Sequence, residues 1–100
     1  MTQPEPPWEV HLNREIRKDL APHGREVNRR LRGALERLQA NPHLGKPLKG
    51  YHGVLSYRVG TPSGEFRITY RLRAEERVIL VDLIKPREEI YKILDRIELD

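Results

Sequence analysis

Arginines alternate with apolar and aromatic residues along residues 50–73, and this spacing could assemble a site for phosphate. Successive side chains of a β-strand point to opposite faces, so the pattern predicts two strands with one apolar and one cationic face. The cationic face would hold Arg58 from the first strand and, from the second, Arg67, Arg71 and Arg73. Guanidinium groups bind phosphate oxygens as a planar fork, so the chemistry that this face indicates is recognition of a nucleic acid.

The excess positive charge is confined to the same part of the chain. The protein has 100 residues, with 19 Lys and Arg, 15 Asp and Glu, and a formal net charge of +4. Residues 41–73 contain six basic residues and only one acid, Glu65, so the remainder of the chain is slightly acidic. A local patch of this kind raises the concentration of phosphate-bearing ligands nearby. An exposed hairpin that is kept soluble by its charges is the alternative interpretation.

The elements that must position these strands can be read from the apolar spacing. Residues 8–12 alternate as a short strand does, and Asn13 can cap a helix that ends near Leu20. After a break, residues 25–38 carry one apolar stripe and predict a second helix. Residues 41–50 are rich in turn-forming types and predict a loop that leads into the first arginine-bearing strand.

The last third of the chain predicts a further strand and a final helix. Residues 77–84 are apolar on both faces except at Asp82, which is typical of a strand inside a sheet. Pro86 and the acids that follow it suit the first turn of a helix. The order β-α-α-β-β-β-α therefore predicts an α+β fold, with a small antiparallel sheet and helices packed on one face. Residues 1–7 are expected as a disordered or extended lead-in to a single domain over residues 8–100.

In the order of its motifs, the chain resembles the RelE/ParE family of toxins. The matching pieces are LQANPHLGKPLKGYHGVLSYRVG, FRITYRL and VILVDLIKPREEIYKIL, and the resemblance as a whole covers roughly residues 10–94. The resemblance implies the RelE-like fold and the role of toxin in a type II toxin–antitoxin module, with a cognate antitoxin protein as partner. RelE-like members cut messenger RNA in the ribosomal decoding site, whereas ParE-like members share the fold and poison DNA gyrase.

The functional positions of the family carry over unevenly. The resemblance implies four catalytic residues, which are Arg58, Arg67, Arg87 and Tyr91. The cationic face, its edges and the preceding loop supply the expected RNA contacts, which are Lys46, Lys49, Ser56, Arg71, Arg73 and Lys85. Ser56 departs from the family pattern, because a basic residue is usual at that position of the strand.

The chemistry implied is RNA cleavage without a metal, in which the 2′-hydroxyl of the substrate attacks the adjacent phosphorus. The phosphorane transition state carries extra negative charge, so preorganised guanidinium groups stabilise it more than the ground state. Tyr91 could protonate the leaving oxygen or stack on a base. The general base is open among Lys49, His52 and Lys85, and His52 is favoured because imidazole titrates near neutral pH.

These assignments have structural alternatives. The two strand arginines could simply pair with nearby acids, Glu65 or Glu75. Arg87 could form a salt bridge along its own helix, Tyr91 could lie at the edge of the core, and His52 could be an exposed loop residue. We expect a ribosome-dependent mRNA endoribonuclease. A ParE-like inhibitor of DNA gyrase and a catalytically inactive antitoxin-binding protein are the alternatives, and both are favoured by Ser56 and by the lack of a clear general base.

Composition excludes several other kinds of site. The chain has no cysteine, which excludes disulfides, thiolate nucleophiles and cysteine-ligated metals. Its 4 histidines lack the spacing of a zinc site, so we expect neither a metal nor a cofactor. No signal-peptide pattern is present and no apolar run reaches membrane-spanning length, so we expect a cytoplasmic protein without a membrane partner.

Overall fold

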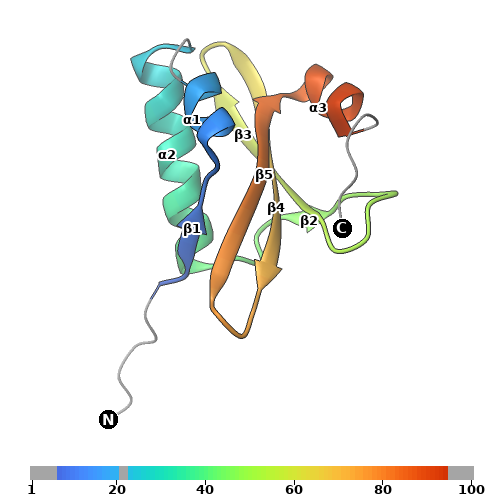
Figure 1. Ribbon diagram of the computed structural model, residues 1–100. Coiled ribbons are helices and arrows are strands. Elements are labelled where there is room, and N and C mark those ends of the chain that lie inside the picture. Colours follow the sequence, from blue (N-terminus) through green and yellow to red (C-terminus); the bar gives the residue numbers. More distant parts are fainter. Residues whose placement is uncertain (1–6, 21–22, 95–100) are drawn as a thin grey trace.

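The described part of the protein is a five-stranded sheet flanked by helices (Figure 1). The computed structural model describes residues 7–20 and 23–94 of the chain. Its elements in chain order are β1 (Glu9–His11), α1 (Arg14–Leu20), α2 (Arg25–Ala40), β2 (Lys46–Pro47), β3 (Leu55–Thr61), β4 (Gly64–Arg73), β5 (Val78–Pro86) and α3 (Arg87–Leu94). This arrangement confirms the predicted α+β fold. Except for Pro7, the expected lead-in falls outside the described residues, as do residues 95–100 of the expected domain.

The strand order in the sheet is β1-β5-β4-β3-β2. The antiparallel meander that the sequence predicts is formed by β3, β4 and β5, and β1 pairs parallel with β5. The short strand β2 pairs antiparallel with β3. It lies within residues 41–50, which the sequence predicts as a loop. None of the described helices is long and apolar enough to cross a membrane.

A β-bulge interrupts the pairing of β4 with β5. The register shifts between Thr69 and Tyr70, so Asp82 is an extra residue on β5 that has no ladder partner on β4. Val81 and Ile84 are three positions apart, yet both are buried in the same core. The extra residue explains this spacing, because the alternation of faces resumes beyond it.

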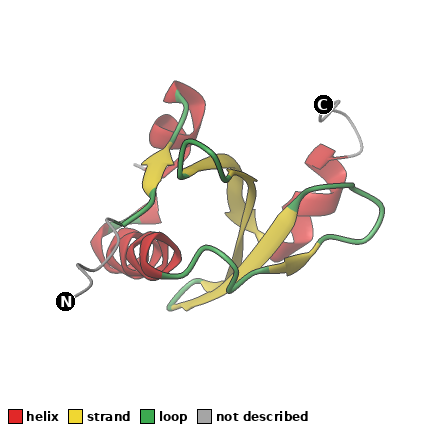
Figure 2. Ribbon diagram, turned by 90° about the horizontal axis from the view of Figure 1, so that it is seen from below, coloured by secondary structure: helices red, strands yellow, loops and turns green. Residues whose placement is uncertain are grey.

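One face of the sheet is covered by α1 and α2 (Figures 1 and 2). Helix α1 begins at the expected cap, because Oδ1 of Asn13 accepts a hydrogen bond of 2.8 Å from the backbone N–H of Ile16. The apolar stripe predicted for α2 is buried, at Val27, Leu31, Ala34 and Leu38. It shares one core with the apolar side of the meander, which includes Val59, Phe66, Ile68, Tyr70, Ile79, Val81 and Ile84. The predicted apolar faces therefore pack against each other.

Helix α3 packs on the opposite face, which differs from the expectation that all helices share one side. Its fully buried Ile90 contacts Leu48 and Val54, with Leu83 alongside. The face that carries the arginines therefore has a small apolar core of its own, and this core holds the last helix. Figure 1 shows α3 on the side of the sheet away from α1 and α2. As a result, α3 starts beside the cationic residues.

Tyr70 ties the loop after α2 to the sheet. Its hydroxyl donates a hydrogen bond of 2.8 Å to the carbonyl oxygen of Pro42 and accepts one of 2.9 Å from the N–H of Gly45. Burial raises the pKa of Tyr70 above its usual value of 10.0. A Cβ on residue 45 would lie 2.5 Å from the Tyr70 hydroxyl, so glycine is needed at this position for the close approach.

Candidate phosphate-binding site

Three of the four residues expected to be catalytic converge on one carboxylate. Nη1 of Arg58 lies 3.8 Å from Oε1 of Glu65, and Nε of Arg67 lies 3.3 Å from Oε2. Nε of Arg87 approaches the same Oε2 to 3.7 Å. The guanidinium groups come from β3, β4 and the first residue of α3. Separate parts of the chain thus form one arginine cluster, which consists of Arg58, Glu65, Arg67 and Arg87.

Strand register brings the arginine cluster together. Arg58 is the ladder partner of Arg67, so their side chains leave β3 and β4 on the same face of the sheet. Phe66 is the partner of Pro86 at the end of β5. This pairing places the next residue, Arg87, beside the start of β4, so the first turn of α3 is held at the cluster by the sheet itself.

The arginines of the cluster differ in how firmly they are held. The side chain of Arg67 is only 16% exposed, whereas those of Arg58 and Arg87 are 65% and 64% exposed. Ion pairs between exposed side chains contribute about 0–1 kcal/mol each. Arg67 is therefore a fixed donor, and the other two arginines can turn toward a ligand at little cost in free energy.

The other basic residues of this face have different surroundings. Arg71 forms a bidentate ion pair with Asp82, in which Nε lies 3.0 Å from Oδ2 and Nη2 lies 2.9 Å from Oδ1. Lys85 is the ladder partner of Arg67 and is half-buried, and Arg73 is exposed at the end of β4. Lys85 thus lies next to the arginine cluster, while the charge of Arg71 is already compensated by a carboxylate.

Ser56, expected as an RNA contact, is buried. It is the ladder partner of Thr69, which is buried as well. Within the described residues, neither Oγ of Ser56 nor Oγ1 of Thr69 has a hydrogen-bond partner. The structure therefore gives Ser56 almost no surface for a ligand, and the two hydroxyls are a cost to stability rather than a contribution to the site.

The expected loop residues lie apart from the arginine cluster in the chain. Lys46 belongs to β2, Lys49 and His52 lie in the turns before β3, and all three side chains are exposed. No ion pair or hydrogen bond joins them to the cluster within the described residues. Tyr91 belongs to α3, but its side chain lies outside the described part of the structure. The general base and the role of Tyr91 therefore stay predictions.

Glu65 is the residue whose position sequence reasoning missed. From the sequence, Glu65 is expected only as an ion-pair partner of the strand arginines. Two features of the sequence indicate that Glu65 belongs to the site. It is the only acid in residues 41–73, and its spacing of two from Arg67 puts both side chains on one face of the strand. The approach of Arg58 and Arg87 depends on neighbouring elements, which the alternation along a single strand does not reveal.

A cavity of about 330 Å³ between α2 and β3 continues the cationic surface beyond the cluster. Its lining includes four arginines, which are Arg29, Arg30, Arg37 and Arg58. One of these lining residues, Arg29, also pairs with Glu26 on the exposed side of α2, and its hydrogen bond lowers the pKa of the Glu26 carboxyl. Since Arg58 belongs to both the cavity and the cluster, a long anionic ligand could extend from the cluster toward α2.

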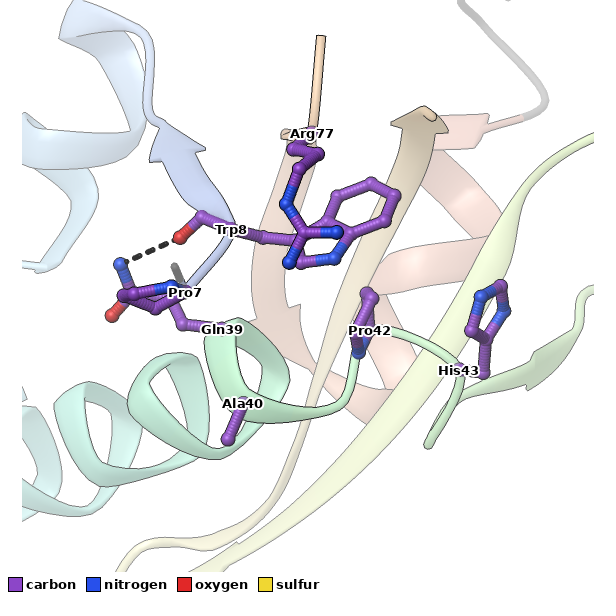
Figure 3. A pocket seen from close by; sticks show the side chains of 7 residues that line it. All are labelled: Pro7, Trp8, Gln39, Ala40, Pro42, His43 and Arg77. Atoms are coloured by element: carbon purple, nitrogen blue, oxygen red, sulfur yellow. Dashed lines mark hydrogen bonds between the residues drawn. The ribbon is translucent and has the colours of Figure 1, made fainter. Parts of the chain in front are cut away.

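A larger cavity of about 580 Å³ lies elsewhere, between the start of β1 and the end of α2 (Figure 3). The guanidinium of Arg77 lies over the indole ring of Trp8, 5.3 Å from its centroid, and His43 lines the same cavity. Arg77 lies at the turn between β4 and β5, whereas Arg87 follows the far end of β5. This cavity is thus separate from the arginine cluster. In the described part of the chain, no group of three or more His, Cys, Asp or Glu side chains could hold a metal ion.

Residues 10–91 match the family model of the ParE toxin of the type II toxin–antitoxin system parDE. This match confirms the resemblance found in the sequence. No curated protein matches the chain.

The fold is similar to that of solved RelE toxins. A double mutant of the E. coli toxin RelE in the free state gives a TM-score of 0.69 at 18% sequence identity, over 92% of this chain and 99% of that chain. The toxin–antitoxin complex RelBE2 from Mycobacterium tuberculosis gives 0.68 at 26% identity, over 81% of this chain and 99% of that chain. The archaeal RelE–RelB complex from Pyrococcus horikoshii gives 0.62 at 22% identity, over 80% of this chain and 94% of that chain.

Proposed function

Because the chain belongs to the ParE toxin family of type II toxin–antitoxin systems, we propose that it is a toxin that cleaves messenger RNA in the ribosomal decoding site. The observation that carries the proposal is the arginine cluster, in which guanidinium groups from β3, β4 and α3 surround one point. Such an arrangement can bind a phosphodiester from several sides. The similarity in fold to RelE toxins supports RNA as the substrate.

In the proposed reaction, the 2′-hydroxyl attacks the adjacent phosphorus and forms a cyclic phosphate, and the 5′-oxygen of the next nucleotide leaves with a proton. Arg67 binds a non-bridging oxygen from its fixed position, and Arg58 and Arg87 approach the same phosphate. Their interaction strengthens as negative charge builds up in the phosphorane. Tyr91 supplies the proton of the leaving group, and Lys49, His52 or Lys85 accepts the proton of the nucleophile.

The proposed partner in the resting cell is an antitoxin protein, as membership of the family implies. Its neutralising segment is acidic where it meets the arginine cluster, because opposite charges across an interface set its orientation and its specificity. The ribosome as the place of action puts the toxin in the cytoplasm.

Inhibition of DNA gyrase is the second candidate function. Two observations favour it: the matching family model is that of ParE, and the buried Ser56 replaces a basic residue that RelE-like members carry on this strand. In this alternative, the same surface or α3 contacts gyrase and no RNA is cut. An inactive family member that only binds an antitoxin is the third.

Primer extension on transcripts from cells that express the protein tests the proposal, alongside a supercoiling assay with gyrase and the purified protein. We expect cuts in phase with codons and no inhibition of supercoiling. Arg67→Gln should lower cleavage about 10²–10³-fold with folding intact by circular dichroism. Arg14→Gln makes the same change of charge at an exposed position of α1 and should cleave as the wild type does.

The alternatives give other results in the same pair of assays. Inhibition of supercoiling without cuts would select the gyrase inhibitor. The absence of both activities, with antitoxin binding retained, would indicate an inactive member. Cleavage by Arg67→Gln at the wild-type rate would show that the arginine cluster is not the site.

A further inference from the structure

Glu65 brings negative charge into the one place where the proposed function needs positive charge. Both of its oxygens are engaged, since Oε1 faces Arg58 while Oε2 faces Arg67 and Arg87. Its side chain is 31% exposed, so solvent and ligands reach it. One carboxylate compensates only one of the three guanidinium charges, and the cluster keeps an excess of positive charge around it.

We propose that the Glu65 carboxylate occupies the place of a ligand phosphate and exchanges with it when the ligand binds. The inference deepens the proposed function and rests on it for the natural ligand, a phosphodiester of RNA. A carboxylate and a phosphodiester both present two oxygens to guanidinium donors, so one can replace the other at the same nitrogens. Glu65 is thus a positioning residue that keeps the arginines directed at one point and also competes with the ligand for them.

The distances and exposures decide which of these two effects is larger. The contacts of Arg58 and Arg87 with Glu65, at 3.8 Å and 3.7 Å, are longer than hydrogen bonds, and both arginines are mostly exposed. Such pairs contribute little to holding the side chains in place. The negative charge of Glu65, in contrast, repels a bound phosphate at close range. Competition therefore outweighs preorganisation, and removal of the charge should tighten the binding of an anion.

Within the described residues, no other acid takes part in the cluster. Asp82 forms a bidentate ion pair with Arg71, which lies further along β4 than Arg67. Glu88 and Glu89 lie in the first turn of α3, and neither is paired with a cluster arginine. The effect on anion binding is therefore specific to Glu65, and the same substitution elsewhere should not reproduce it.

The test measures the binding of two probes that the protein cannot cleave. Inorganic phosphate is titrated by NMR at the Nε–H signal of Arg67, and a labelled 2′-O-methyl oligoribonucleotide is titrated by fluorescence anisotropy. Glu65→Gln and Glu65→Ala should both bind these probes about fivefold to tenfold more tightly than the wild type does. Glu65→Asp keeps the charge and should bind close to the wild-type affinity.

Glu26→Gln is the matched control, because it removes a glutamate that also pairs with two arginines, Arg29 and Arg30, but on α2. It should leave the affinity for inorganic phosphate, measured at the Arg67 signal, unchanged. Equal tightening in Glu26→Gln and Glu65→Gln would trace the effect to net charge and overturn the inference. Unchanged or weaker binding by folded Glu65→Gln and Glu65→Ala would overturn it as well.

Failure of the inference and failure of the proposed function are distinguishable. Neither probe has a 2′-hydroxyl next to a phosphate, so the titrations do not depend on whether the chain is a nuclease. Tighter binding by Glu65→Gln together with a wild type that cuts no transcript would support the exchange and reject the nuclease. Cleavage by the wild type without tighter binding by Glu65→Gln would do the reverse.

Discussion

Asp82 binds Arg71 with both carboxylate oxygens, at 3.0 Å from Nε and 2.9 Å from Nη2. The pair joins β4 to the bulged residue of β5, and the side chain of Asp82 is only 11% exposed. Asp82→Asn removes the charge that compensates Arg71, so the free energy of unfolding should fall by about 2 kcal/mol. Urea unfolding measures this loss. Glu26→Gln breaks an exposed ion pair on α2 and should leave the urea midpoint unchanged, so an equal loss in both variants would contradict the argument.

Stability in alkaline solution should depend on the buried hydroxyl of Tyr70. Burial raises the pKa of Tyr70 in the folded protein above its usual value of 10.0. Such a group contributes stability that is complete below the unfolded pKa and is lost as the pH rises through the folded pKa. The wild type should therefore become less stable above about pH 10. Tyr70→Phe should lack this part of the loss in urea unfolding between about pH 8 and about pH 11, and parallel curves would count against it.

Thr69→Val should stabilise the protein. Oγ1 of Thr69 is buried and has no hydrogen-bond partner among the described residues. Replacing the hydroxyl with a methyl group therefore removes a buried, unsatisfied polar atom. We expect a gain of about 1 kcal/mol in the free energy of unfolding. Thr61→Val is the matched control, because Oγ1 of Thr61 donates to the carbonyl oxygen of Gly64 at 2.8 Å and accepts from the N–H of Ser63 at 3.1 Å. Thr61→Val should lower the free energy of unfolding. If both substitutions changed the free energy of unfolding in the same direction, the difference in hydrogen bonding between the two hydroxyls would not determine stability.

Arg87→Gln should change how salt affects the binding of RNA. If Arg87 contacts one phosphate, its removal should reduce the slope of log affinity against log salt concentration by about 0.7, the value for one contact to a single strand. Anisotropy titrations of a 2′-O-methyl oligoribonucleotide at several salt concentrations measure the slope. Arg14→Gln removes the same charge at the start of α1 and should keep the wild-type slope. An unchanged slope in Arg87→Gln would remove this arginine from the site.

The helices and strands could be predicted from the sequence because their signals are local. The stripe of α2 and the alternation along β4 each depend only on residues within one element. The side on which α3 packs is not local. Ile90 is the residue that the helix buries, but Leu48 and Val54, which contact it, lie in the loop segments around β2 and before β3, far from α3 in the chain. The sequence therefore predicts the helix and not its position.

The site follows the same division. The cationic face of β3 and β4 is local, and Arg58 and Arg67 were both predicted from it. The meeting of Arg87 with Glu65 depends on the pairing of Phe66 with Pro86, which is set by the length of the β4–β5 hairpin and its bulge. No alternation pattern carries that information, so the sequence could name the arginines without showing what lies between them.

Asp82, the extra residue in β5, limits how far the cationic face extends along β4. In an uninterrupted strand, Val81 would be followed directly by Leu83, and Arg71 would lose the carboxylate that bulges toward it. Loss of a single codon would thus keep the buried and exposed sides of the strand in phase while removing the negative charge that lies beside Arg71. Under the proposed function, the insertion of Asp82 would direct the phosphates of the RNA to the end of the sheet where α3 begins.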